Sequence, residues 1–261
     1  MRNALAVYVR EVRSYFVSPI FYILAFVFMC VVGNVFKDTF FAFANQTMDY
    51  LRMAQNYKTA IPVMYVNMVA GTVFTYINFL FLLIVPLLTM RLYAEEKKTG
   101  TMELLMTSPI TTTQVMLGKF FSALTIYTLM LVLTMAFNVI MMIESGGKLE
   151  WGPVFSSYLG TILLGSAIIS IGMFFSSLTE NQIVAAAVTI SAIMGLWLLF
   201  ATSQYLNPPY NTFVRYLSFP EHLDSFTQGF IGIKHIFYFL SVTVFGLFLT
   251  GISVESARWR Q

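Results

Sequence analysis

The stretch AGTVFTYINFLFLLIVPLLTM, residues 70–90, contains no Asp, Glu, Lys or Arg. Its length matches the roughly 20 apolar residues that an α-helix needs to cross about 30 Å of hydrocarbon. The apolar character is continuous and does not alternate from residue to residue, which favours a helix over a strand of a membrane β-barrel. The stretch therefore predicts a transmembrane helix.

Five more uncharged runs of similar length are bounded by charged or helix-breaking residues. They are centred on 20–36, 120–143, 154–175, the segment between Glu180 and Asn207, and 235–254. Hydrophobic residues make up 58% of the chain and charged residues only 10%, whereas soluble domains carry about 25% charged residues. The sequence thus predicts an all-α membrane protein with six transmembrane helices, formed by a single domain over residues 1–261, with the lipid bilayer around it.

The distribution of Lys and Arg predicts the orientation. An even number of spans places both termini on one side, and that side would hold nine basic residues against six on the other. Because cytoplasmic loops carry the excess of Lys and Arg, we expect both termini in the cytoplasm. The net charge of +3 does not come from a basic stripe, so no nucleic-acid partner is expected.

Three segments outside the spans carry patterns of their own. Residues 1–16 place apolar side chains at helical spacing, which predicts an amphipathic helix in the membrane interface, the alternative being a plain extension of the first span; these side chains are Leu5, Tyr8, Val9, Val12 and Phe16. Residues 207–234 are too apolar for a solvated loop and too interrupted to span, so re-entrant or interface-lying short helices are expected there. Residues 37–69 are expected to form a small external cap.

The segment 91–118, between the second and third spans, encodes two breaks. Gly100 ends one helix, a short helix then starts at Thr101, and the residue before Pro109 avoids the helical region. Thr111 has Gln114 three positions later, the spacing of a capping box that begins the next helix. From the residues alone, a mechanical handle for a soluble partner and an ordinary connector are equally good interpretations.

Residues 93–110, YAEEKKTGTMELLMTSPI, followed by Leu117-Gly118-Lys119, closely resemble the coupling-helix region of type-2 ABC exporter permeases. Residues 218–241 resemble the subgroup of gliding-motility and copper-enzyme-maturation permeases. The resemblance implies a bacterial cytoplasmic (inner) membrane protein that pairs with a second permease subunit. It also implies a separate ABC ATPase, which binds the ATP and Mg. The coupling contacts that it implies are Glu95, Glu96, Gly100, Thr101, Glu103, Leu104, Leu105, Ser108 and Pro109.

The motifs that the sequence lacks agree with a permease whose ATPase is a separate subunit. The sequence has no G-x-x-x-x-G-K-[ST] phosphate-binding loop, so we expect no enzymatic activity and no cofactor in this chain. The span centres carry no Asp, Glu, Lys or Arg, which argues against an ion-driven transporter. The alternative function is a membrane subunit that transmits force to a periplasmic partner in a motility or secretion machine, without a small-molecule cargo.

Three further sets of residues have a structural and a functional interpretation. The 16 Met and two His residues are interpreted as packing side chains, so no metal site is expected. Glu221, His222 and Asp224 fit either the cap of a short helix after Pro220 or an acid–base or metal cluster, and the cap is preferred. Small residues at four-residue spacing let helices approach closely, and the resemblance favours the fifth span as the pairing seam; these residues are Ala187, Ser191 and Gly195.

Overall fold

The computed structural model describes residues 2–57, 64–102, 110–145 and 149–258, and every element in these ranges is a helix. Six candidate membrane spans are long and apolar enough to cross a bilayer, which confirms the predicted fold class. They are formed by α2 (Pro19–Tyr57), α3 (Met64–Thr89) with α4 (Arg91–Lys98), α6 (Thr112–Leu133) with α7 (Met135–Glu144), α8 (Trp151–Leu178), α9 (Gln182–Ser203) and α12 (Ile233–Arg258). The remaining helices are α1 (Arg2–Val17), α10 (Tyr210–Tyr216) and α11 (Phe219–Thr227).

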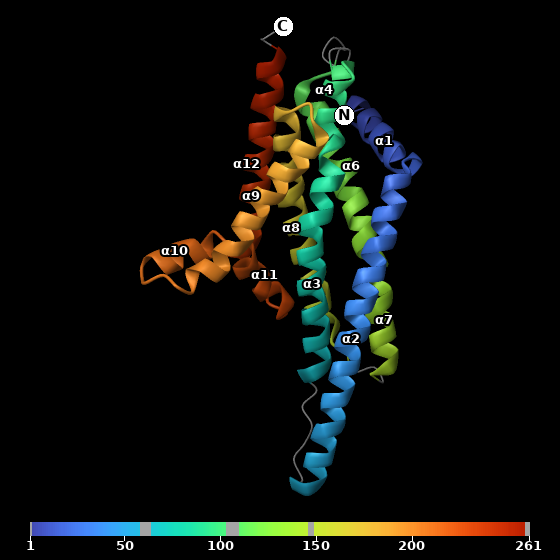
Figure 1. Cartoon of the computed structure of the whole chain (residues 1–261), viewed down its shortest axis with the longest axis vertical. Coiled ribbons are helices and arrows are strands. Elements are labelled where there is room, and N and C mark those ends of the chain that lie inside the picture. Colours follow the sequence, from blue (N-terminus) through green and yellow to red (C-terminus); the bar gives the residue numbers. More distant parts are fainter. Residues whose placement is uncertain (1, 58–63, 103–109, 146–148, 259–261) are drawn as a thin grey trace.

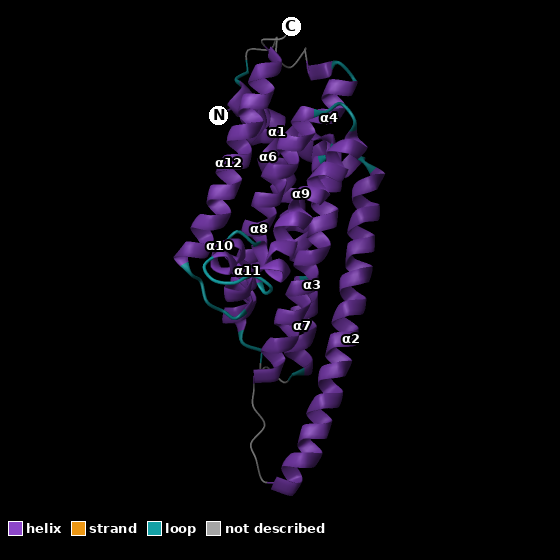
Figure 2. Ribbon diagram, turned by 60° about the vertical axis from the view of Figure 1, so that its left-hand side comes forward, coloured by secondary structure: helices purple, strands orange, loops and turns teal. Residues whose placement is uncertain are grey.

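The long helices run side by side, and both ends of the chain lie at the same end of the bundle (Figure 1). We call this the terminal end; α1, α4 and the start of α6 also lie there. Helices α10 and α11 turn away from the bundle direction about half-way along the molecule. Beyond them α2, α3 and α7 continue towards the opposite end, as a second view also shows (Figure 2).

Helix α8 is the centre of the bundle. Of its most apolar window, 67% is buried inside the protein, compared with 17% for α2 and 22% for α9. Glycines on α8 make room for neighbours: a Cβ atom on Gly165 would lie 2.2 Å from the ring of Tyr127, and one on Gly172 would lie 2.2 Å from Thr89 Oγ1. Helices α3 and α6 therefore pack closely against α8.

The first and third spans differ from the predicted ones. Helix α2 continues past Lys37 to Tyr57, so its 39 residues extend about 58 Å at 1.5 Å per residue. The first part of the expected cap is thus a helical extension, while residues 58–63 lie outside the described ranges. The third span is divided at Thr134, whose hydroxyl donates to the carbonyl of Leu131 and contacts Tyr158 Oη at 3.0 Å.

The predicted N-terminal helix is present as α1, inclined to α2 (Figure 1). Its buried side chains, Val7 and Tyr15, are not part of the predicted apolar stripe. Packing against α6 uses Gly118, where a Cβ atom would lie 3.0 Å from the carbonyl oxygen of Ala4. Of the stripe, Leu5, Val9 and Phe16 are exposed, whereas Tyr8 and Val12 are half-buried. The position of α1 in the membrane interface stays a prediction.

The region 207–234 contains two short helices, α10 and α11, as predicted. Helix α11 packs on α8 through Phe226, whose carbonyl accepts hydrogen bonds from Ser156 and Ser157. On the same helix, Glu221 forms an ion pair with Arg215 of α10. The re-entrant position of these helices in a bilayer stays a prediction.

Candidate functional site

The candidate site is the junction of α1, α4 and α6 at the terminal end. Helix α4 lies at the end of the second span and forms the first part of the segment 91–118. Helix α6 begins within the same segment, with Thr111 as its N-cap. The capping box is formed as predicted: Gln114 N donates to Thr111 Oγ1 at 3.3 Å, and Thr111 N donates to Gln114 Oε1 at 3.4 Å.

A buried lysine is the centre of this junction. The side chain of Lys119 on α6 is 1% exposed, and its Nζ lies 2.8 Å from Glu96 Oε1 and 3.0 Å from Glu11 Oε1. It also donates to the carbonyl oxygen of Leu92 at 2.7 Å. An ammonium group has three N–H donors, so all three are matched by acceptors. Because an unpaired buried charge is costly, this cluster holds α1, α4 and α6 together.

Arg10 completes the cluster from its exposed side. Its Nη2 lies 2.8 Å from Glu11 Oε1 and 2.9 Å from Glu96 Oε1. Burial alone would raise the pKa of Glu11, but the charges of Lys119 and Arg10 and their hydrogen bonds outweigh it, so this pKa is lowered. The Glu11 carboxylate is therefore ionised at neutral pH. We call these four residues, Arg10, Glu11, Glu96 and Lys119, the ion cluster.

The first turn of α4 is fixed to the end of α8. The backbone N–H groups of Tyr93 and Ala94 both donate to Ser176 Oγ at 3.1 Å. Ser176 in turn donates to the carbonyl of Met90 at 2.8 Å. The first N–H groups of a helix have no partner within the helix, so a serine from another helix supplies the cap. Lys97 extends the attachment by donating to the carbonyl oxygen of Ser177.

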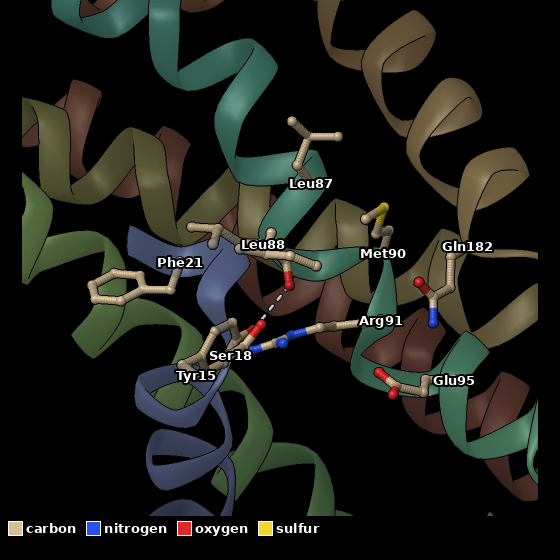
Figure 3. Close-up of a pocket in the computed structure, with 10 residues that line it drawn as sticks. Tyr15, Ser18, Phe21, Leu87, Leu88, Met90, Arg91, Glu95 and Gln182 are labelled. Carbon is tan, nitrogen blue, oxygen red and sulfur yellow. Dashed lines mark hydrogen bonds between the residues drawn. The ribbon is translucent and has the colours of Figure 1, made fainter. Parts of the chain in front are cut away.

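A pocket of about 170 Å³ opens beside α4. Arg91 lies across it with its guanidinium 3.9 Å from the centre of the Tyr15 ring, and Tyr15 Oη donates to the carbonyl of Leu88 at 2.9 Å (Figure 3). Burial raises the pKa of Tyr15, so this phenol stays a neutral donor. Glu95 and Gln182 line the other side of the pocket. These contacts attach α1 to the end of the second span, as the ion cluster also does.

The predicted coupling residues fall into three groups. Glu95, Gly100 and Thr101 are exposed at the end of α4 and just beyond it, whereas Glu96 points into the ion cluster. Gly100 has φ +70°, the left-handed backbone that glycine adopts without strain, and it follows the C-cap of α4 as predicted. The others lie outside the described residues: Glu103, Leu104, Leu105, Ser108 and Pro109.

With this geometry in place, a comparison with protein families is decisive. The family model described as ABC-2 family transporter protein matches residues 5–254. The chain belongs to this family. No curated protein matches it.

This ABC-2 permease is accordingly a multi-pass membrane protein and the permease subunit of an ABC transporter, and membership of the family implies an ABC ATPase partner. The resemblance to type-2 ABC permeases is confirmed. The assignment to the gliding-motility and copper-maturation subgroup stays a prediction.

The small residues of the fifth span lie on an uncovered face of the permease. Ala187, Ser191 and Gly195 are all exposed, and a Cβ atom on Gly195 would meet nothing within 4 Å. Ser166 and Ser170, which have the same spacing on α8, are instead buried against α12, where Ser166 contacts Thr243 at 3.0 Å. The pairing role of α9 stays a prediction.

The sequence did not indicate the ion cluster. Lys119 was part of the quoted motif without a role, and Arg10 and Glu11 lie outside the apolar pattern of residues 1–16. Glu11 and Lys119 are separated by 108 positions, so no spacing rule connects them. The available signal was Gly118 beside Lys119, because a glycine within a predicted helix indicates a close neighbour.

Proposed function

We propose that this permease is an exporter subunit driven by ATP that a separate ATPase subunit hydrolyses. Its coupling element is the segment 91–118 together with α1, and both termini lie in the cytoplasm of a bacterial inner membrane. The ATP and Mg belong to the ATPase, and a second permease subunit pairs with the chain across the exposed face of α9 that carries Ala187, Ser191 and Gly195.

The ion cluster is the observation that supports this proposal. A partner that pushes on the segment beyond Gly100 acts on α4, and α4 is bonded to α1 and α6 through Lys119 and Glu96. It is also bonded to α8 through Ser176. Force applied at one short helix would therefore reach the first, second, third and fourth spans together, rather than bending a loop.

The test is co-expression with the ATPase encoded next to this chain, followed by purification in lipid nanodiscs. The Glu103→Arg and Thr101→Arg variants should lose bound ATPase and its stimulation, while they insert into the membrane as wild type does. The Lys119→Met variant should keep the bound ATPase but lose the stimulation, because the segment is intact and its attachment to the spans is not. The control is Lys37→Met, which removes an exposed lysine of α2 outside the coupling segment. Failure of the wild-type chain to bind the ATPase would refute the proposal.

A second candidate function is supported by the length of α2. About 30 Å of hydrocarbon takes roughly 20 helical residues, whereas α2 has 39, so about half of it stands outside the bilayer. In this alternative, ATP-driven motion acts on a periplasmic partner through the projection of α2, α3 and α7, and no cargo moves. Shortening the projection by whole turns should then abolish function while ATPase stimulation persists.

A further inference from the structure

The two histidines of the chain meet between α11 and the start of α12. His222 is fully buried, His235 is 4% exposed, and their Nδ1 atoms are 2.8 Å apart. This pair lies away from the terminal end, and neither the ion cluster nor the proposed coupling uses it. It was not expected from the sequence, where His222 was read as part of a helix cap.

The hydrogen bonds fix the position of each proton. His222 Nε2 lies 2.7 Å from the carbonyl oxygen of Tyr216, which can only accept, so His222 carries its proton on Nε2. Its Nδ1 is then an acceptor, and His235 must donate to it from Nδ1. This leaves His235 Nε2 as the acceptor for Ser225 Oγ at 3.0 Å. In the neutral pair the hydrogen bonds therefore all run in one direction, from Ser225 through His235 and His222 to the carbonyl of Tyr216.

The chain of hydrogen bonds connects three helices. His222 belongs to α11 and stacks on Tyr238 of α12, with the ring centres 3.8 Å apart and the rings 10° from parallel. Tyr238 Oη donates to the carbonyl of Leu217, the residue that ends α10, at 2.7 Å. The pair thus holds α10 and α11 against the beginning of the last span.

Among the described residues, Glu221 is the acidic group whose charge favours protonation of both histidines. Arg215 of α10 forms an ion pair with Glu221 of α11, and Asp224 accepts from the amide of Gln228 at 2.8 Å. Lys234, next to His235, adds positive charge. The helices α3, α8 and α9, which pack against α11, contain no Asp, Glu, Lys or Arg. Burial lowers the pKa of His222 below its ordinary value, as these surroundings require.

We propose that His222 and His235 form a proton-binding site that holds α10 and α11 against α12 while it carries at most one proton. The first proton binds His235 Nε2, the Ser225 hydroxyl turns to become the acceptor, and the bond between the imidazoles persists. The second proton must bind His222 Nδ1. Two N–H groups and two positive charges then face each other across 2.8 Å, and the contact opens.

The direction of the pH effect follows from proton uptake on opening. Once the closed pair holds one proton, it takes up the second only at a pH below the ordinary histidine pKa of 6.5, whereas separated histidines bind it near 6.5. Between the pH at which the closed pair takes up its second proton and pH 6.5, the open form therefore holds one proton more. The closed form loses stability as the pH falls through this range, about tenfold for each pH unit. At neutral pH the site is closed.

The test uses the fact that the chain has only two His residues. Full-length protein with ¹⁵N-labelled imidazoles in nanodiscs gives two ring signals, assigned with His235→Asn. At about pH 7.5, where unperturbed histidines are neutral, we expect one Nε2–H ring, His222, and one Nδ1–H ring, His235. Two rings of the same tautomer, or two rings that both titrate independently near 6.5, would overturn the proposal.

Hydrogen exchange of residues 210–227 tests the opening itself. After correction for the intrinsic rate, exchange in the wild type should rise about tenfold for each unit by which the pH falls below the ordinary histidine pKa of 6.5. In His235→Asn the side-chain amide can donate to the neutral His222 ring and, turned over, accept from the protonated ring through Oδ1. The repulsion between two positive charges is also absent, so exchange should stay low over the same range. His222→Ala should exchange fast at every pH. If His235→Asn opens with acid as wild type does, the site is not the histidine pair.

Discussion

Replacement of Lys119 by Met removes the charge at the centre of the ion cluster and keeps the aliphatic stem. Loss of one partner of a buried ion pair costs roughly 3–5 kcal/mol. Arg10 still contacts both carboxylates, and the side chains of Glu11 and Glu96 are each 14% exposed, so the free energy of unfolding should fall by about 3 kcal/mol. At roughly 2 °C per kcal/mol for a chain of this size, the thermal midpoint in nanodiscs falls by about 6 °C.

A double variant separates the charge from the packing. In Lys119→Met the carboxylate of Glu96 is buried without its lysine, and its Oε2 has no partner even in the wild type. Adding Glu96→Gln removes that unmatched charge, so the double variant should recover about 1–2 kcal/mol relative to the sum of the single variants. Lys98→Met, on the exposed end of α4, should leave the midpoint unchanged. Simple additivity of the two cluster substitutions, or a fall of under about 1 °C for Lys119→Met, would refute a buried ionic junction.

The other predictions use the same thermal assay. Ser176→Ala leaves two N–H groups of α4 without a cap and should cost about 1–2 kcal/mol; an unchanged midpoint would show that water replaces the hydroxyl. Gly165→Ala should cost at least about 1–3 kcal/mol, because its methyl group would overlap the Tyr127 ring, whereas Gly195→Ala should not destabilise. Because the pKa of Glu11 is lowered from 4.5, its contribution is present above that pH and lost as the pH falls through the lowered value; Glu11→Gln should remove this acid dependence.

Local signals in the sequence predicted local structure well. Charges bounded the spans because a charged side chain is costly in hydrocarbon. Gly100 and the capping box of Thr111 with Gln114 were placed correctly, since each depends on residues within four positions. The end of α2 was missed because Lys37 and Asp38 end the uncharged run but do not end the helix. After Gly33 the helix contains no Gly or Pro that would end it, so it continues to Tyr57.

The candidate site and the histidine pair could not be predicted, because both depend on contacts between distant segments. Lys119 reads as a basic residue at a membrane edge until Glu11 and Glu96 are seen around it. His222 reads as a capping residue until the chain folds back and places His235 against it. In both cases the sequence shows the chemical group, and only the packing of helices decides which partner satisfies it.

The two clusters are joined by one helix. Ser176 of α8 caps α4 at the terminal end, and Ser156 of the same helix donates to the carbonyl of Phe226 on α11. Twenty residues of uninterrupted helix separate the two serines, a distance of about 30 Å. Helix α8 is the most buried of the spans, and its glycines pack directly against Tyr127 and Thr89. We therefore expect α8 to move as a rigid body. A displacement of α4 would then reach α11 directly, and release of the histidine pair would free α11, which packs on the far end of α8, from α12.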